Sequence, residues 1–427
     1  MHNLKSLLLA FTLTVTGLLS AGEKQTTNAA SQGSSYIFVW AGDAAHKSTD
    51  FLAVIDAQPS SPDYGRIVAT APIGESGTQP HHTEYEFPAD NILFADGWVA
   101  GQTFIFDLND PLKPRVVGSF KDRAGYTFPH SYVRLSNGNL LGTFQSHSVG
   151  YAPGGGLVEV TEKGDVVRTS SAVDPAVDKD LIWPYSLDVD SKKDLVITSS
   201  TPMGWPDWKP MPAGSWPLKQ VNDQVTSQVQ LWRLSDLKLL KTITLTDPHG
   251  KHNLYPAEPR VLPDGSIYVN TFSCGLYLVK DVTTQQASAQ QVFTFPGGDG
   301  GSMGNICSVP VIAGHYLVQT VGALPGLIVL DISNPAKPVE VSRLVLDHQF
   351  MMPHWLAADR KSSRLVLTGD DQNWLLVLLL DPATGALTID ESFHEPGSTT
   401  PGISFNRADW PHGKNGPAVV HGALFGR

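Results

Sequence analysis

The dipeptide Pro-His recurs in this chain, and at least its first three copies lead into strand-like runs. The copies are Pro80-His81-His82, Pro129-His130, Pro353-His354 and Pro411-His412. Aligning the apolar runs that follow gives a set of equivalent positions, spaced at about 50 residues with one longer gap, as in repeat proteins. The aligned residues are His82, His130, Tyr185, Ala257, Cys307, His354 and His412. This period restricts the chain to a repeat architecture.

Each repeat has the pattern of four antiparallel strands. The repeat that begins at Pro129 has a strand at 129–135, a turn at 136–139 and further strands at 140–143 and 156–160. Alternating apolar residues separated by Asn/Gly turns are typical of antiparallel hairpins. Four strands in about 55 residues predict an all-β fold, a seven-bladed β-propeller whose blades surround a central channel.

The two ends of the chain are predicted to close one blade together. The N-terminal part supplies strands at 36–40, 51–57 and 66–71 but no motif strand before them. The C-terminal part supplies the motif Trp410-Pro411-His412-Gly413, with little sequence after it. Pairing these strands removes an exposed sheet edge. Residues 36–427 are therefore expected to form a single propeller domain.

Residues 1–22 have the pattern of an export signal. A basic start that ends at Lys5 precedes the apolar run 6–19 and the small residues Ser20-Ala21-Gly22, as in secretory signals. The apolar run is shorter than a membrane span, so no membrane anchor is expected. The mature protein is expected to be periplasmic or secreted, with residues 23–35 as a flexible N-terminal segment.

Charge and local composition argue against two kinds of ligand, nucleic acids and nucleotides. The formal net charge of -11 at pH 7 argues against a nucleic-acid partner, which requires clustered Lys and Arg. The glycine-rich stretch 297–301 lacks the strand-then-helix context of a phosphate loop.

The only cysteines are Cys274 and Cys307, and the sequence leaves open whether they are buried thiols or one disulfide. The tryptophan-rich insertion 201–219 either covers one mouth of the channel or packs on the propeller face.

Four of the aligned positions are histidines, and this predicts a metal site. Innermost propeller strands line the channel, so His82, His130, His354 and His412 are expected to converge. Neutral imidazoles are ligands for Zn, Cu, Fe and Ni. Alternation along a strand normally allows only one of His81 and His82 to face the axis. The alignment favours His82, and His81 is expected either to brace a neighbour or to bind the metal if the strand bulges. The alternative is a set of channel histidines held by backbone groups and water.

Two other polar residues are candidates for acid-base chemistry. Tyr185 and Glu258 lie on or beside inner strands, and a carboxylate next to an apolar strand suggests a proton acceptor or a partner of a metal ligand. A structural carboxylate is the alternative for Glu258. Seven further histidines are expected in turns or outer strands, and among them His147 and His252 lie in loops that could reach the axis from the same channel mouth. The set is His147, His249, His252, His315, His348, His394 and His421.

Several segments together resemble the selenium-binding protein and methanethiol oxidase family. The family's early blades carry a Ser-Pro-x-Tyr segment and a His-His pair, which match Ser61-Pro62-Asp63-Tyr64 and Pro80-His81-His82. The likeness continues through Phe128-Pro129-His130, the tryptophan-containing insertion and Pro256-Ala257-Glu258-Pro259-Arg260.

The resemblance implies a seven-bladed propeller with a histidine copper site that oxidises methanethiol, with O2 and water, to formaldehyde, sulfide and hydrogen peroxide. His81, His82 and His130 match the family's histidines directly. His412 stands for the family's late histidine in a different local motif, and His354 matches a position that need not be histidine. Gly65 replaces the family's selenium-associated cysteine, and the cysteine pair after His-His is missing from 83–98. Selenium binding through those thiols is therefore not expected.

These observations predict a copper-dependent oxidase of small thiols. The thiol would bind the metal as thiolate, O2 would accept the electrons, and Glu258 or Tyr185 would carry a proton. Two alternatives remain: a non-catalytic exported propeller that binds a metal, ligand or protein, and a metal-dependent hydrolase. The metal that the protein carries distinguishes the three.

Overall fold

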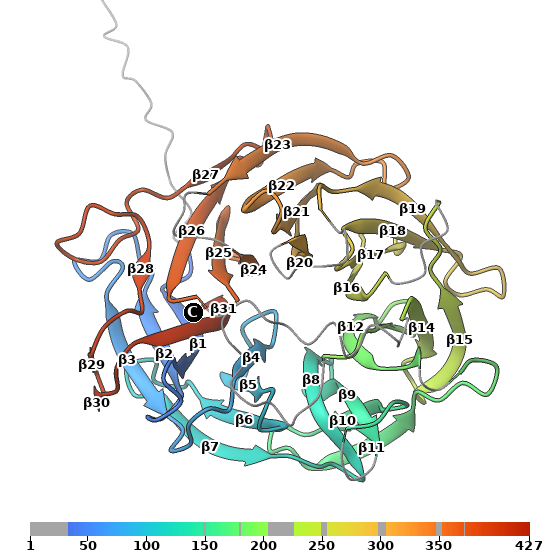
Figure 1. The fold of residues 1–427 in the computed structure, drawn as a ribbon, viewed down its shortest axis with the longest axis horizontal. Helices are drawn as coiled ribbons and strands as arrows, with labels where there is room; N and C mark the ends of the chain where they lie inside the picture. Colours follow the sequence, from blue (N-terminus) through green and yellow to red (C-terminus); the bar gives the residue numbers. More distant parts are fainter. Residues whose placement is uncertain are drawn as a thin grey trace, which may run out of the picture. The chain divides into compact units, whose positions relative to one another are not determined.

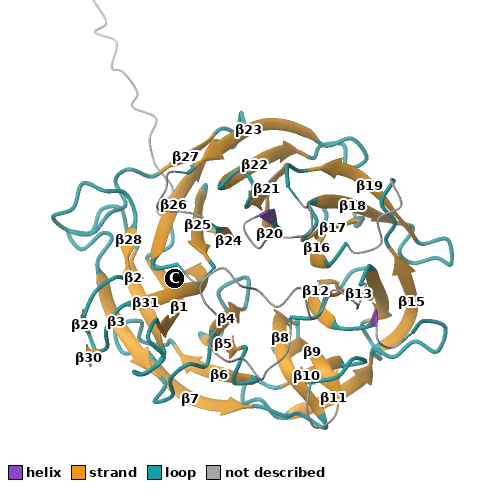
Figure 2. Cartoon of the chain, in the orientation of Figure 1, coloured by secondary structure: helices purple, strands orange, loops and turns teal. Residues whose placement is uncertain are grey.

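Nearly all regular structure in the described part of the chain is β-strand (Figure 2). The computed structural model describes residues 33–147, 151–178, 181–203, 226–248, 254–297, 305–346, 352–370 and 372–427. All of them lie in one unit, Gln32–Arg427. The predicted export signal, residues 23–32 and most of the tryptophan-rich insertion lie outside the described residues. No helix within the described ranges has the length and apolar character that a membrane crossing requires.

Seven antiparallel sheets lie in a ring (Figure 1), which confirms the predicted seven-bladed β-propeller. Blades 2 to 4, from the inner to the outer strand, comprise β4 (Pro80–Thr83), β5 (Ile92–Gly97), β6 (Gln102–Asp107), β7 (Arg115–Phe120); β8 (Tyr126–Arg134), β9 (Leu140–His147), β10 (Gly156–Val160), β11 (Val166–Ser171); and β12 (Pro184–Asp190), β13 (Leu195–Ser200), β14 (Gln228–Arg233), β15 (Lys238–Thr244).

Blades 5 to 7 have the same order. They comprise β16 (Pro256–Val261), β17 (Ile267–Thr271), β18 (Gly275–Lys280), β19 (Ser288–Thr294); β20 (Cys307–Ala313), β21 (Tyr316–Val321), β22 (Gly326–Asp331), β23 (Val339–Val345); and β24 (Pro353–Ala358), β25 (Arg364–Gly369), β26 (Trp374–Leu380), β27 (Leu387–Ile389), with β28 (Ile403–Ser404) also paired to β26. Strands β5, β13, β21 and β25 are buried along their whole described length or nearly so, because blades pack on both faces of each sheet.

The first blade is closed by both ends of the chain, as predicted. It comprises β1 (Tyr36–Asp43), β2 (Phe51–Asp56), β3 (Ile67–Pro72) and, innermost, β31 (Ala418–Gly426). The identity of the closing strand differs from the prediction. The motif at 410–413 forms a small hairpin of β29 (Asp409–Trp410) and β30 (Gly413–Lys414), and the apolar run after it pairs with β1.

A buried ion pair ties blade 7 to the N-terminal strands. Arg364 Nη2 lies 2.8 Å from Asp359 Oδ2, and the two side chains are 5% and 0% exposed. Arg364 also donates hydrogen bonds to the carbonyls of Ser34 and Ala57, at 2.8 and 2.6 Å. The Ser34 amide and hydroxyl donate in turn to Asp359. The pair therefore stabilises the ring at its closure.

A disulfide joins blades 5 and 6 and answers the question that the sequence left open. Cys274, beside β18, is bonded to Cys307 at the start of β20, with a Cα–Cα distance of 4.9 Å. Disulfides of this kind persist in oxidising compartments.

All seven inner strands share one irregularity. In each, the pairing with the second strand shifts by one residue near the start of the strand, so the inner strand carries one extra residue. Such a β-bulge re-aims side chains and breaks the usual alternation between faces. Two successive residues can therefore approach the channel axis at each bulge.

Candidate metal centre

Five histidines from four blades meet near the axis. His81 and His82 lie on β4, His130 on β8, His354 on β24 and His421 on β31, and each is at most 4% exposed. Ring centroids are 4.3 Å apart for His81 and His82, 4.3 Å for His82 and His130, and 4.5 Å for His354 and His421. The rings therefore form one continuous buried cluster, the histidine cluster.

The histidine cluster contains two overlapping groups with metal-ligand spacing. His81, His82 and His130 form one group, and His81, His354 and His421 form the other; within each, the ligand atoms lie within 4.8 Å of one another. His81 belongs to both groups. Imidazole nitrogens at this spacing suit a transition-metal ion.

The shared bulge explains how the sequence builds the cluster. The first residue of each bulge, which follows Pro80 or its equivalent, is His81, His130, Tyr185, Ala257, Ser308, His354 or His421. This register corrects the sequence alignment at three places, because the residues equivalent to His130 are His81 rather than His82, Ser308 rather than Cys307, and His421 rather than His412. His82 occupies the second position of its bulge. The rings of His81 and His82 are stacked with an interplanar angle of 5°, so both join the cluster.

His412 does not belong to the cluster. It lies half-buried in the β29–β30 turn, where its Nδ1 is 2.8 Å from Thr70 Oγ1 and its ring contacts Phe51. His421 occupies the inner-strand position that was predicted for His412. Sequence reasoning missed His421 because Val420 precedes it in place of proline, although the apolar run 418–425 is itself a strand signal. Two loop histidines were predicted near a channel mouth. His147 is exposed at the end of β9, and His252 lies outside the described residues.

Burial favours the neutral form of four imidazoles of the cluster, those of His81, His82, His130 and His421. Desolvation lowers the pKa of His81, His82 and His421 well below the usual value, and neighbouring histidines add to the effect. Desolvation likewise lowers the pKa of His130 to about 3. A neutral imidazole offers one lone pair to a metal ion. The rings are therefore ready to bind a cation without first losing a proton.

Metal affinity is expected to depend weakly on pH in the mildly acidic range. A ring whose pKa lies far below 6.5 holds no competing proton there, so affinity for a divalent ion should change by less than about threefold between pH 7.5 and 5.5. An exposed histidine of ordinary pKa would lose about tenfold per ring over that range. Chelator competition at several pH values, corrected for protonation of the chelator, measures the difference. A tenfold loss per ring would contradict neutral rings in the unloaded protein.

Serine hydroxyls orient the rings of the cluster. Ser131 Oγ lies 2.9 Å from His82 Nδ1 and 3.0 Å from His130 Nδ1, and Ser308 Oγ lies 2.9 Å from His354 Nδ1. The buried Nε2 atoms of His82 and His130 make no hydrogen bond to any described residue. Metal-binding histidines show this arrangement, in which the second ring nitrogen is held by a hydrogen bond. The residues present therefore fit a bound metal ion.

One buried carboxyl group lies beside the cluster. Asp96 Oδ2 is 3.9 Å from His81 Nδ1, beyond hydrogen-bond distance. Burial raises the pKa of Asp96 well above its usual range. A cavity beside His421 is lined by Gly42, Asp43, His46, Asp50, Gln79, Pro80, Asp370, Val419, Val420 and His421.

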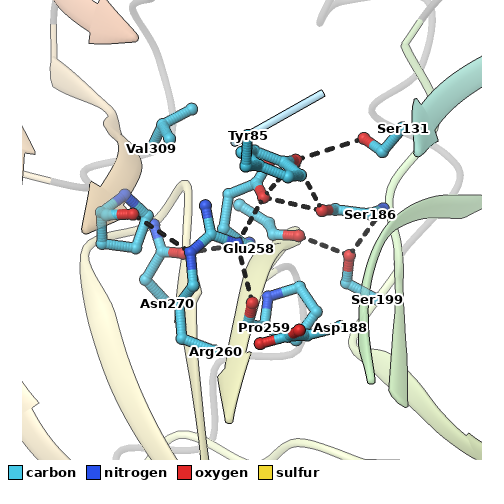
Figure 3. Close-up of polar contacts among 12 residues, drawn as sticks. Tyr85, Ser131, Ser186, Asp188, Ser199, Glu258, Pro259, Arg260, Asn270 and Val309 are labelled. Atoms are coloured by element: carbon cyan, nitrogen blue, oxygen red, sulfur yellow. Dashed lines mark hydrogen bonds and ion pairs between the residues drawn. The ribbon is translucent and has the colours of Figure 1, made fainter. Parts of the chain in front are cut away.

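The two predicted acid-base residues lie at different distances from the histidines. The Tyr185 ring packs against His130, with ring centroids 4.0 Å apart. Glu258 lies one layer away and accepts hydrogen bonds from Tyr85 at 2.6 Å, Ser186 at 2.7 Å and Arg260 at 3.0 Å (Figure 3). Sequence reasoning missed Tyr85, because it follows β4 and no repeat position marks it.

Known proteins share both sequence and fold with this chain. A methanethiol oxidase from a Hyphomicrobium species is 27% identical over 224 residues, which are 49% of this chain and 48% of that protein. A methanethiol oxidase of Ruegeria pomeroyi is 27% identical over 192 residues, 40% of this chain and 42% of that protein. Selenium-binding protein 1 of Arabidopsis thaliana is 25% identical over 126 residues, 26% of this chain and 25% of that protein. The chain thus spans about half the length of the curated relatives it matches, or less. No family model matches it.

Solved structures share the propeller at lower identity. A hypothetical selenium-binding protein from Sulfolobus tokodaii superposes with a TM-score of 0.67 and 16% identity, covering 92% of this chain and 93% of that one. A periplasmic gluconolactonase of Pseudomonas aeruginosa has a TM-score of 0.59 and 12% identity, covering 86% and 97%. At such identities the likeness shows the fold alone. The sequence matches confirm the predicted resemblance to selenium-binding proteins and methanethiol oxidases.

Proposed function

We propose that this chain is a copper-dependent oxidase of small thiols that acts on methanethiol or a close analogue. The observation that carries the proposal is the histidine cluster: five buried imidazoles, in two groups that share His81. The sequence likeness to methanethiol oxidases supports a thiol substrate. An oxidase needs a metal that changes its oxidation state, and zinc does not. Copper suits imidazole ligands and also binds thiolate.

The residues of the chain have distinct roles in this proposal. His81, His82, His130, His354 and His421 would hold the metal, and bound copper would supply a soft site for the thiolate and one-electron redox chemistry with O2. Burial of these rings excludes bulk water from the metal. The cavity lined by His421 lies beside the cluster, and we propose that a small thiol approaches from this side.

Glu258 and Tyr185 keep their predicted roles as candidate proton carriers, and Tyr185 also has a packing role. Glu258 Oε1 is buried and has no hydrogen-bond partner among the described residues, so it is the atom at which this carboxylate would receive a proton. Tyr185 lies against His130 and limits the space beside that ring. We also propose that the protein acts in the periplasm or is secreted, which the Cys274–Cys307 disulfide supports,.

Metal analysis and oxygen uptake test the function. Protein purified with copper present should carry about one copper per chain, as expected for a specific site. It should consume O2 when methanethiol is added and release formaldehyde, sulfide and hydrogen peroxide, and chelation should abolish the uptake. Copper below about half an equivalent would refute the copper site. O2-independent hydrolysis supported by zinc or calcium would indicate a hydrolase instead, and no bound metal would indicate a binding module.

A further inference from the structure

A layer of polar side chains lies directly beside the histidine cluster. The second residue of the bulge is His82 on β4, Ser131 on β8, Ser186 on β12 and Glu258 on β16. The bulge that sends the first residues toward the axis therefore also places these residues in a common layer. Tyr85 joins it with its hydroxyl group (Figure 3).

Ser131 is the member of this layer whose hydroxyl forms hydrogen bonds with two histidines. Its Oγ lies 2.9 Å from His82 Nδ1, 3.0 Å from His130 Nδ1 and 3.3 Å from the Tyr85 hydroxyl. Ser131 itself is fully buried. Its hydroxyl therefore has three protein partners, which equals its capacity of one donated and two accepted hydrogen bonds.

The far end of the layer sets the direction of these hydrogen bonds. Arg260 donates to Glu258 Oε2 at 3.0 Å, so Glu258 is a carboxylate that only accepts. Tyr85 donates its single proton to the same Glu258 oxygen at 2.6 Å. The Tyr85 oxygen is then left to accept, and a Ser131 proton directed at it satisfies all three contacts of the Ser131 hydroxyl. Both lone pairs of Ser131 remain for the imidazoles.

This direction determines the protonation pattern of two rings. A serine oxygen that accepts from both requires a proton on Nδ1 of His82 and on Nδ1 of His130. Each Nε2 then carries a lone pair. The same two Nε2 atoms are buried and make no hydrogen bond to any described residue, as this pattern requires.

We infer that Ser131 is a positioning residue that holds His82 and His130 in one tautomer, with both Nε2 lone pairs available to a metal ion. The hydrogen-bond chain Tyr85–Glu258–Arg260 fixes the direction in which Ser131 donates its proton. The inference rests on the proposed function only in that these histidines bind a metal. It concerns the ligands' orientation and applies to any divalent ion that they hold.

The test is Cu²⁺ affinity of the full chain, measured by chelator competition, with an electron paramagnetic resonance spectrum at full loading. Ser131→Ala should lower affinity about 10- to 100-fold, the usual cost of losing a hydrogen-bond partner of metal-binding histidines. The nitrogen hyperfine pattern should change as well. Tyr85→Phe removes the acceptor of the Ser131 proton and should give a smaller loss, of several-fold.

Ser186→Ala is the matched control. Ser186 donates to the same Glu258 oxygen at 2.7 Å and lies 2.9 Å from the Tyr85 hydroxyl, but it has no hydrogen bond to a histidine in the described part of the chain. Its replacement should leave Cu²⁺ affinity within about twofold of the unmodified protein. Equal affinities for Ser131→Ala and Ser186→Ala would overturn the inference, with thermal unfolding reporting any general loss of folding. Failure of the unmodified chain to bind Cu²⁺ would instead overturn the proposed function.

Discussion

Replacing His421 with alanine is expected to remove most of the bound copper, whereas replacing His412 is expected to leave it bound. His421 is 4% exposed, its ring lies 4.3 Å from that of His81 and 4.5 Å from that of His354, and it belongs to a group with metal-ligand spacing. Loss of a direct ligand should exceed the 10- to 100-fold cost of disturbing a ligand's hydrogen-bond partner. Copper per chain after dialysis, measured by mass spectrometry, gives the answer.

Two variants frame this experiment. His130→Ala removes a ligand from the other group and should also lose copper, since His130 is fully buried in the cluster. His412→Ala removes only a turn residue that contacts Thr70 and Phe51. Copper retained by His421→Ala but lost by His412→Ala would contradict this expectation. It would show that His412, the late histidine assigned from the family resemblance, is the metal ligand and His421 on β31 is not.

Replacing Arg364 with methionine should lower the free energy of unfolding by about 3–5 kcal/mol, the cost of leaving one charge of a buried pair without its partner. Burial opposes ionisation of Asp359, but hydrogen bonds from Ser362, the Lys361 amide, Ser34 and Arg364 outweigh it and lower the pKa of Asp359 to about 2. The carboxylate therefore stays charged near neutral pH. Chemical denaturation of the unloaded protein measures the change.

An exposed pair provides the control. Arg343 and Glu340 on β23 also form an ion pair, but their side chains are 50% and 28% exposed, and such pairs contribute about 0–1 kcal/mol. Arg343→Met should therefore change the free energy of unfolding by less than about 1 kcal/mol. Adding Asp359→Asn to Arg364→Met should recover part of the loss, because the uncompensated charge is then removed. If Arg364→Met and Arg343→Met cost the same, the pair at 359 and 364 does not stabilise the closure.

Most of the fold could be read from the strand and turn pattern. The three N-terminal strands agree with β1, β2 and β3 within a few residues, and both chain ends meet in one blade. The identity of the last strand could not be read in the same way. The motif 410–413 resembles the inner-strand motif locally, but only long-range pairing with β1 shows that the following run fills that place.

Some residues of the candidate site could be predicted from the sequence, and others could not. The repeated Pro-His motif predicted His82, His130 and His354 as site residues, and all three lie in the cluster. The roles of Tyr85 and Ser131 were not visible, because both depend on which atoms approach across blades that are far apart in sequence. Side-chain contacts of this kind leave no local pattern.

The sequence by itself determined the repeat, the seven blades and the residue type that the channel presents, because these follow from local periodicity, turn chemistry and composition. Only the tertiary structure decided which histidines share a site. Long-range pairing of β31 with β1 places His421 where His412 was expected. Bulges one residue long change the face to which a side chain points, and they bring His81 beside His82 and set Ser131 between two imidazoles. A shift of one residue is invisible in a pattern with a period of about 50, yet it decides where every ligand atom lies.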